Sequence, residues 1–208
     1  LIMFWGHNPI YSGPDGELGF GVREALARKP KTIVVDPRET MLARKADVWL
    51  QLRPGTDDAL ALAMLNVIIT EGLEDKEFVQ KWCHGFDELA ERVKDYTPEW
   101  AEPVTWVSAD KIREAARLYA QVRPSMLEWG CAIEHTPACF QTVRALLCLP
   151  SITGNIDQPG SWSFGMAPVP PFPQLFDKMP MEQQEKRLGY SEFKALSGEL
   201  AQLPSAHI

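Results

Sequence analysis

The chain has 208 residues, of which 45% are hydrophobic and 24% charged, and its net charge at pH 7 is −7. This composition is typical of a globular protein with one α/β domain or two small ones, and the acidic balance argues against a nucleic-acid partner. No stretch approaches the roughly 18 uninterrupted apolar residues that span a bilayer, so no membrane segment is expected. The first 53 residues carry a small excess of Lys and Arg, which suits an anionic ligand and equally a solvated helix face.

Short apolar, β-branched or aromatic runs predict four strands. They lie at residues 1–6, 32–36 (TIVVD), 48–53 (VWLQLR) and 125–129 (SMLEW). The first two runs do not alternate with polar residues, as expected for strands that are covered on both faces in a parallel sheet.

Helical patterns separate and follow these strands. They are predicted at 17–29, 57–71, 74–82, 86–94, 108–121 and 137–152. Residues 57–71 are apolar nearly all round, which predicts a central buried helix with Thr56 as its N-cap and Gly72 just past its end. The alternation of strands and helices predicts an α/β fold, a Rossmann-like three-layer αβα domain with a mostly parallel sheet, over residues 1–162.

The composition changes at residue 163. The sequence becomes Pro-rich and shows no regular hydrophobic period, so residues 163–208 are predicted to form an extended arm and a poorly defined tail. One short helix is expected in that tail, near 181–188.

Ligands of open α/β sheets bind outside the carboxyl ends of the strands, so the loops there are the candidate site. The first candidate is the loop Gly6, His7, Asn8 and Pro9, where Gly permits close backbone approach and the Asn amide can bond a phosphate or sugar. A plain turn is the simpler alternative. No GxGxxG follows the strand, which removes the main support for a nicotinamide-linked dehydrogenase.

The second candidate is the turn Asp36, Pro37 and Arg38. An acidic residue at the tip of the second strand often holds a ribose hydroxyl pair, and the planar fork of Arg38 suits a phosphate. A surface turn with a local ion pair explains the same residues.

The third candidate is the loop Gly55, Thr56 and Asp57, where a strand ends and a helix begins on adjacent carboxylates. Carboxylates repel a phosphate but match a base edge that is rich in N–H donors, such as that of guanine. Ordinary helix capping is the structural alternative.

A fourth patch, WGCAIEHT at 129–136, again leads from a strand to a Gly. The chain shows no Ser/His/Asp order, no phosphate-binding GKT or GKS loop and no close carboxylate pair, so no catalytic residue is predicted. Its cysteines form no CxxC pair and lack metal-ligand spacing with the histidines, so no metal site is predicted. The compartment stays open, and unpaired cysteines favour the cytoplasm.

Four segments together resemble the molybdopterin oxidoreductase family, of the dimethyl-sulfoxide-reductase and formate-dehydrogenase type. They are WGHNPIYS, VVDPRETMLARKADVWLQLRPGTDDALALAMLNVII, WGCAIEHT and QTVRALLCLPSITGNIDQPGSW. The resemblance implies a bis(molybdopterin guanine dinucleotide) cofactor with molybdenum or tungsten, held by an α/β domain of a larger catalytic subunit. It also implies electron or oxygen-atom transfer as the chemistry.

The resemblance also implies roles for the candidate residues. Gly6, His7, Asn8 and Pro9 would hold cofactor phosphates; Asp36, Pro37 and Arg38 would form a nucleotide-contacting turn; Gly55, Thr56 and Asp57 would face guanine. Gly130 and Glu134 align with the stretch that approaches the pterins, although many relatives have Gln where this chain has Glu134.

Members of this family carry further parts that this sequence does not match. These are a Cys motif for a 4Fe-4S cluster, a metal ligand upstream of the first loop, and a C-terminal domain that completes the cofactor site. We therefore expect an internal fragment, with the remaining domains of the same subunit and an electron-transfer subunit as partners. The segments WGCAIEHT and TGNIDQPGSW are similar to the subgroup containing acetylene hydratase, which implies a hydration without net redox change.

A cofactor-free scaffold is the alternative function. The large iron–sulfur subunit of respiratory complex I resembles the same family yet lacks the pterin. The presence of all three candidate loops argues against this alternative, because a scaffold has no need of them.

Overall fold

The computed structural model describes residues 1–12, 16–163 and 179–186. The chain forms two compact units, Leu1–Phe164 and Gly165–Ile208. In the second unit, the described residues include helix α11 (Met181–Glu185), at the position where the sequence predicts a short helix. The rest of the predicted Pro-rich arm and tail lies outside the described residues.

Within the described part of the first unit, four parallel strands form one sheet in the order β3-β2-β1-β4. The strands are β1 (Ile2–Trp5), β2 (Thr32–Val35), β3 (Val48–Leu50) and β4 (Met126–Trp129). All four predicted strands are confirmed. Strand β3 is shorter than predicted because the chain leaves the sheet after Leu50, and the Arg53 N–H donates instead to the Thr105 carbonyl at 2.7 Å.

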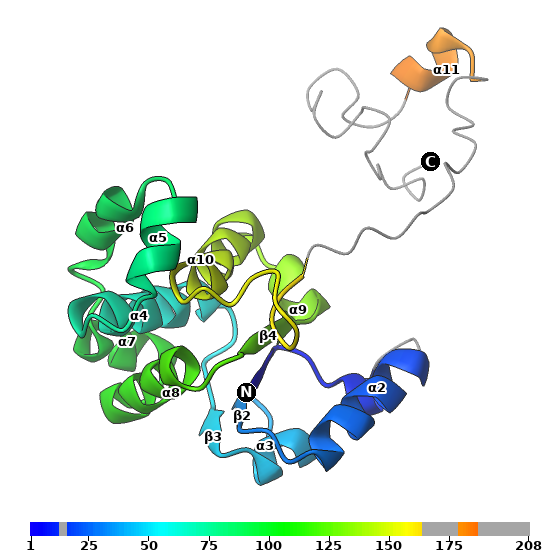
Figure 1. Ribbon diagram of the computed structural model, residues 1–208. Helices are drawn as coiled ribbons and strands as arrows, with labels where there is room; N and C mark the ends of the chain where they lie inside the picture. Colours follow the sequence, from blue (N-terminus) through cyan, green and yellow to red (C-terminus); the bar gives the residue numbers. More distant parts are fainter. Residues whose placement is uncertain (13–15, 164–178, 187–208) are drawn as a thin grey trace. The chain divides into compact units, whose positions relative to one another are not determined.

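Helices cover both faces of this sheet, which confirms the predicted α/β class (Figure 1). On one side lie α1 (Pro9–Ser12), α2 (Gly16–Ala27) and α3 (Met41–Lys45). On the other side lie α4 (Asp57–Thr70), α5 (Lys76–Trp82), α6 (Phe86–Val93), α7 (Pro98–Thr105), α8 (Ala109–Gln121) and α10 (Cys139–Ile152). The short helix α9 (Cys131–Glu134) follows β4 directly.

Alternating side chains of the strands divide the core between the two faces. Met3 and Trp5 of β1 join the large cluster around α4, whereas Phe4 joins a small cluster on the side of α2 and α3. Helix α4 packs against α7, α8 and α10, so its predicted central position is confirmed.

The start of α4 differs from the expectation in one respect. Thr56 occupies the N-cap position, but its side chain accepts no hydrogen bond from the first turn. Its hydroxyl donates instead to the Arg53 carbonyl at 2.7 Å, which stabilises the turn before the helix.

Four of the helices in the described residues are absent from the prediction: α1, α3, α7 and α9. Three of them have only four or five residues, too few for a 3.6-residue period to show, and α7 carries an internal Pro103. Because α1 begins at Pro9, the predicted first loop is shorter by one residue. None of the described helices has both the length and the apolar character needed to cross a membrane.

Candidate functional site

The carboxyl ends of the four strands form one edge of the sheet, because all the strands are parallel. From β1 the chain proceeds to β2 and then β3 on one side, whereas β4 pairs with β1 on the other side. The strand order therefore reverses between β1 and β4, and open α/β sheets bind ligands in the crevice at such a switch point. The four candidate loops each follow one strand and so lie along this edge.

The tips of β1 and β4 approach each other closely at two glycines. A Cβ atom at Gly130 would lie 2.6 Å from the Gly6 carbonyl oxygen and 3.1 Å from the His7 Cβ. Gly6 itself has φ +58°, a left-handed conformation that glycine adopts without strain. Glycine at position 130 is therefore required by the close packing of the two strand tips.

His7 and Asn8 bring buried polar atoms to the tip of β1. The His7 Nδ1 lies 3.1 Å from Oε1 of Glu128 on β4, and both side chains are largely buried. The His7 Nδ1 and the Glu128 Oε1 are not oriented for a hydrogen bond. Among the described residues, the His7 Nδ1 and the Asn8 Oδ1 are therefore buried without a hydrogen-bond partner. Burial raises the pKa of Glu128, and the nearby imidazole of His7 opposes this rise. Unpaired buried polar atoms cost free energy, and this tip therefore suits a polar ligand.

The turn after β2 is held largely by its own residues. Asp36 is 4% exposed, and its Oδ1 accepts the Arg38 backbone N–H at 2.8 Å. The Arg38 Nε lies 3.5 Å from the same oxygen, so the local ion pair considered as an alternative is present. The Trp49 Nε1 donates to the Asp36 carbonyl at 2.9 Å, and the Gln51 Nε2 donates to the Pro37 carbonyl at 3.1 Å. The contact of Asp36 with a ribose stays a prediction.

The loop after β3 leads to a buried carboxylate. Gly55 has φ +81°, and apart from its own atoms and those of its chain neighbours no described atom lies within 4 Å of the position where its Cβ would be. Asp57 is 9% exposed, and its Oδ1 accepts a 2.8 Å hydrogen bond from the Trp5 Nε1. Burial raises the pKa of Asp57, while the Trp5 bond favours the charged form. The loop that is predicted to face guanine, called the base loop below, is thus hydrogen-bonded to the strand that precedes the first loop.

Glu134 and Gly130 contact different parts of the protein. It is exposed at the end of α9, and its Oε1 accepts the Trp129 Nε1 at 3.0 Å. The Trp129 ring stacks on Trp162 with centroids 5.4 Å apart. The structure therefore brings Gly130 to the first loop and Glu134 to an aromatic pair.

Sequence reasoning missed several residues of this edge. The clearest available signal was Glu128, a carboxylate inside the apolar strand SMLEW. Nothing in the sequence distinguishes Trp5 from an ordinary core residue, because its bond to Asp57 spans 52 positions. Within residues 1–12, 16–163 and 179–186, no group of three or more His, Cys, Asp or Glu side chains is arranged to hold a metal ion.

A doubly wound parallel sheet with polar loops at its switch point defines an α/β ligand-binding domain. Comparison with known families identifies which one. The molybdopterin oxidoreductase family model matches residues 1–194, and the chain belongs to this family.

Individual relatives agree with this assignment. The chain is 37% identical to acetylene hydratase of Syntrophotalea acetylenica over 180 residues, covering 85% of the chain and 24% of the relative. It is 40% identical to formate dehydrogenase H of Escherichia coli over 169 residues, covering 81% of the chain and 23% of the relative. The solved structure of acetylene hydratase from Pelobacter acetylenicus matches with a TM-score of 0.76 and 34% identity, over 94% of the chain and 27% of that structure. The chain thus spans about a quarter of the length of these relatives.

Proposed function

We propose that this chain is a domain that holds bis(molybdopterin guanine dinucleotide) in a molybdenum- or tungsten-dependent oxidoreductase. The observation that carries the proposal is the loop edge of the sheet. Its first loop presents the buried Asn8 Oδ1, which has no hydrogen-bond partner among the described residues, and its third loop presents a buried carboxylate. An uncharged scaffold surface would need neither, because both features cost folding free energy.

The loops suit successive parts of a nucleotide. The side-chain Oδ1 of Asn8 needs a hydrogen-bond donor, such as a sugar hydroxyl or a ring N–H, while the NH₂ of the same side-chain amide suits a phosphate oxygen. Asp36 and Arg38 would contact the ribose and its neighbouring phosphate. Trp5 occupies one oxygen of Asp57 and orients its carboxylate, whose other lone pairs match the two N–H donors on the guanine edge.

The close contact between Gly6 and Gly130 brings the tips of β1 and β4 together beside the His7 and Asn8 side chains. We assign this end of the sheet edge to the pterins on the family resemblance; Glu134, whose carboxylate accepts the Trp129 Nε1, stays a predicted pterin contact. When bound, the metal–pterin group supplies electron or oxygen-atom transfer. The residues of this chain bind and orient the group, and Gly55, Thr56, Asp57, Asp36 and Arg38 act only at its nucleotide end.

The parent protein is proposed to contain the parts that lie outside this chain. These are a 4Fe-4S cluster, the metal ligand, further domains of the same subunit and contacts with an electron-transfer subunit. The chain is similar to a hydratase and to dehydrogenases alike, and we propose the oxidoreductase class. A cofactor-free scaffold remains the alternative, and molybdenum and tungsten analysis of the intact parent distinguishes the two.

The direct test is Asp57→Asn in the full-length parent enzyme. Asn keeps an acceptor for the Trp5 N–H but removes the charge that attracts the guanine N–H donors. We expect the bound metal and the guanine nucleotide released on denaturation both to fall about tenfold, the order of effect of one lost charged hydrogen bond. The matched control is Asp58→Asn, one residue further along the same helix turn. Unchanged metal and guanine content in the Asp57 variant would contradict the proposal.

A further inference from the structure

Trp106 combines a strained backbone conformation with high exposure, and its backbone N–H caps α7 by donating to the Glu102 carbonyl at 2.9 Å. It ends α7 with φ +65° and ψ 8°, in the left-handed region that a bulky L-residue adopts only with strain. Helix ends of this kind are usually occupied by glycine. The side chain is 69% exposed, so it buries little apolar surface that would offset the strain. A strained and exposed tryptophan points to a role outside the core.

Trp106 is physically linked to the loop that precedes Asp57. The Arg53 guanidinium lies over the Trp106 ring, 5.6 Å from its centroid. The backbone N–H of Arg53 donates to the carbonyl of Thr105, the residue just before Trp106, at 2.7 Å. The Arg53 carbonyl in turn accepts the Thr56 hydroxyl at 2.7 Å. The indole and the base loop are therefore held as neighbours by three contacts that involve Arg53.

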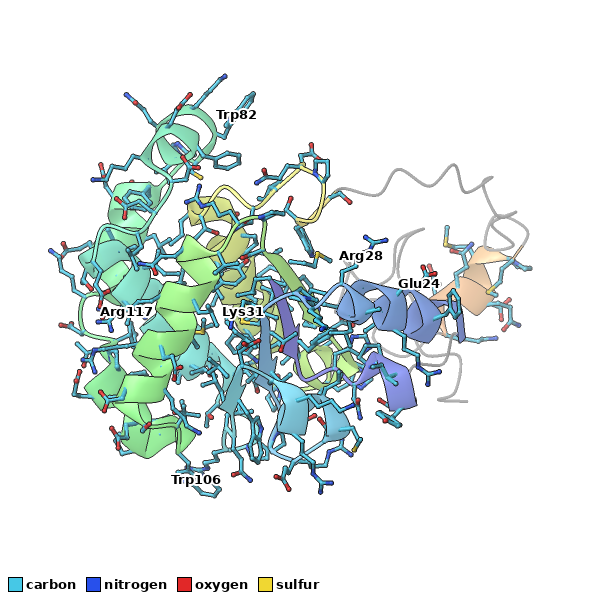
Figure 2. The ribbon with its side chains drawn as sticks, turned by 60° about the horizontal axis from the view of Figure 1, so that its bottom comes forward. Glu24, Arg28, Lys31, Trp82, Trp106 and Arg117 are labelled. Atoms are coloured by element: carbon cyan, nitrogen blue, oxygen red, sulfur yellow. The ribbon has the colours of Figure 1, made fainter. Side chains whose placement is uncertain are left out.

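The space and the charge around this pair are open to a ligand. No carboxylate among the described residues forms an ion pair with Arg53, so its guanidinium stacks on the indole without neutralisation. Beside it, the position of a Gly55 Cβ has no described atom within 4 Å apart from those of Gly55 and its two chain neighbours. Figure 2 shows Trp106 projecting from the first unit at the opposite end of the view from Trp82.

We propose that Trp106 and Arg53 form the stacking wall of the base end of the nucleotide site. The proposal rests on the proposed function and extends it to two residues that were not among the predicted cofactor contacts. Indole rings and guanidinium planes both stack on nucleobases without regard to base identity. Asp57 therefore accepts hydrogen bonds from the edge of the guanine ring, which gives selectivity, whereas Trp106 and Arg53 stack on the face of the ring.

The test is a titration of the 208-residue chain with GDP, ADP and CDP, in which binding is measured by tryptophan fluorescence and by calorimetry. In the wild-type chain, GDP should quench part of the emission. Trp106→Ala should abolish that quench and weaken GDP binding about tenfold, in the range measured for base–aromatic stacking. ADP binding should weaken by the same factor, and Trp106→Phe should retain most of the affinity because it keeps an aromatic face.

Trp82→Ala is the matched control. Trp82 is 68% exposed and also has a cation over its ring, with the Lys81 Nζ 5.2 Å from the centroid, but it ends α5 rather than adjoining a predicted loop. Its removal should change neither the quench nor the affinity for any nucleotide.

The possible outcomes separate the two proposals. GDP binding that is unchanged in Trp106→Ala overturns the stacking wall and leaves the Asp57 site intact. A preference for GDP over ADP that is unchanged in Asp57→Asn overturns the proposed base site, while a Trp106 effect would still support the wall. A wild-type chain that binds none of the three nucleotides at millimolar concentration overturns the stacking wall, and the metal content of the parent then decides the proposed function alone.

Discussion

The Trp5 indole N–H donates a 2.8 Å hydrogen bond to the Asp57 carboxylate, although the two residues lie 52 positions apart. Trp5 is the last residue of β1, and Asp57 is the first residue of α4. The bond therefore fixes the beginning of the first loop against the end of the third. The proposed nucleotide would therefore meet two loops that the protein already holds in a fixed relation.

Loss of the Trp5 donor should destabilise the fold. Trp5→Phe keeps a large aromatic side chain in the core but removes the N–H, which leaves the buried Asp57 carboxylate with one partner fewer. An unsatisfied buried polar group costs about 1–3 kcal/mol, and we expect a loss of this order in the free energy of unfolding from urea titration. Trp129→Phe removes an N–H from a bond to an exposed carboxylate and should cost clearly less. Equal losses in the two variants would show that the Asp57 bond carries no special weight.

Asp57 should make stability fall as the pH rises. Burial is the largest influence and raises the pKa of Asp57 in the folded state above its ordinary value of 3.8. Between the unfolded pKa of 3.8 and the higher folded pKa, the folded state therefore binds more protons than the unfolded state. The contribution of Asp57 to stability is fully present below pH 3.8 and is lost as the pH rises through the folded pKa. Asp57→Asn should remove this dependence and unfold at higher urea concentration than the wild type at pH 7, with no advantage at pH 3.

Urea titrations at several pH values, with Asp58→Asn as the control, measure this difference. A wild-type chain whose stability rises with pH relative to Asp57→Asn would reverse the sign and would mean that the Trp5 bond outweighs burial. The expected result would instead identify Asp57 as a carboxylate that lowers stability at neutral pH, as binding groups often do.

Gly130 should not tolerate even one added methyl group. The Cβ of Gly130→Ala would meet the Gly6 carbonyl oxygen at 2.6 Å, and both atoms belong to the tightly positioned strand tips. We expect a loss of about 1–3 kcal/mol in the free energy of unfolding from this overpacking. Gly21→Ala is the matched control, because the residue lies inside α2 and a Cβ there has no described atom within 4 Å beyond its chain neighbours and the nearby helix backbone. That control should gain roughly 0.5–1 kcal/mol from the lower backbone entropy of the unfolded chain.

The strands and long helices could be predicted from the sequence because each depends on a local pattern. Thr32–Val35 is an unbroken β-branched run, and Ser108 caps α8 by accepting the Lys111 N–H, as its position predicts. The short helices α1 and α9 could not be predicted because a single turn has no period to detect. Their formation depends on where the strands β1 and β4 deliver the chain.

The candidate site was only partly predictable for a related reason. Glycines and acids that follow strands are visible in the sequence, and so the positions of the four loops were predicted correctly as strand ends. The partners of those residues come from distant segments: Glu128 faces His7 across two strands, and Arg53 lies over Trp106. Neither pairing leaves a local signature, since each arises from the sheet order and from the packing of α7.

Replacement of Trp106 by glycine should increase stability even though it removes an aromatic side chain. Glycine adopts φ +65° without strain, whereas most other residues in this region cost about 1–3 kcal/mol. We therefore expect Trp106→Gly to raise the free energy of unfolding by about 1 kcal/mol. Trp106→Ala keeps the strain while removing the ring, so the difference between the two variants isolates the backbone contribution. A Gly variant no more stable than the Ala variant would show that the turn does not strain the residue.

The assignment of Asp36 to a ribose can be separated from its role in its own turn. Asp36→Asn retains an oxygen that accepts the Arg38 N–H, so the turn and the free energy of unfolding should change little, whereas Asp36→Ala should lose about 1 kcal/mol with that bond. If the carboxylate also accepts a ribose hydroxyl, the wild-type chain should bind GDP about tenfold more tightly than 2′-deoxy-GDP, because hydrogen bonds to charged groups contribute about 1.5–3 kcal/mol. Asp36→Asn should then bind both nucleotides with nearly equal affinity in calorimetric titrations. Discrimination that persists in Asp36→Asn would place the ribose contact elsewhere and leave Asp36 as a turn residue, which its 4% exposure and its bond to Arg38 already explain.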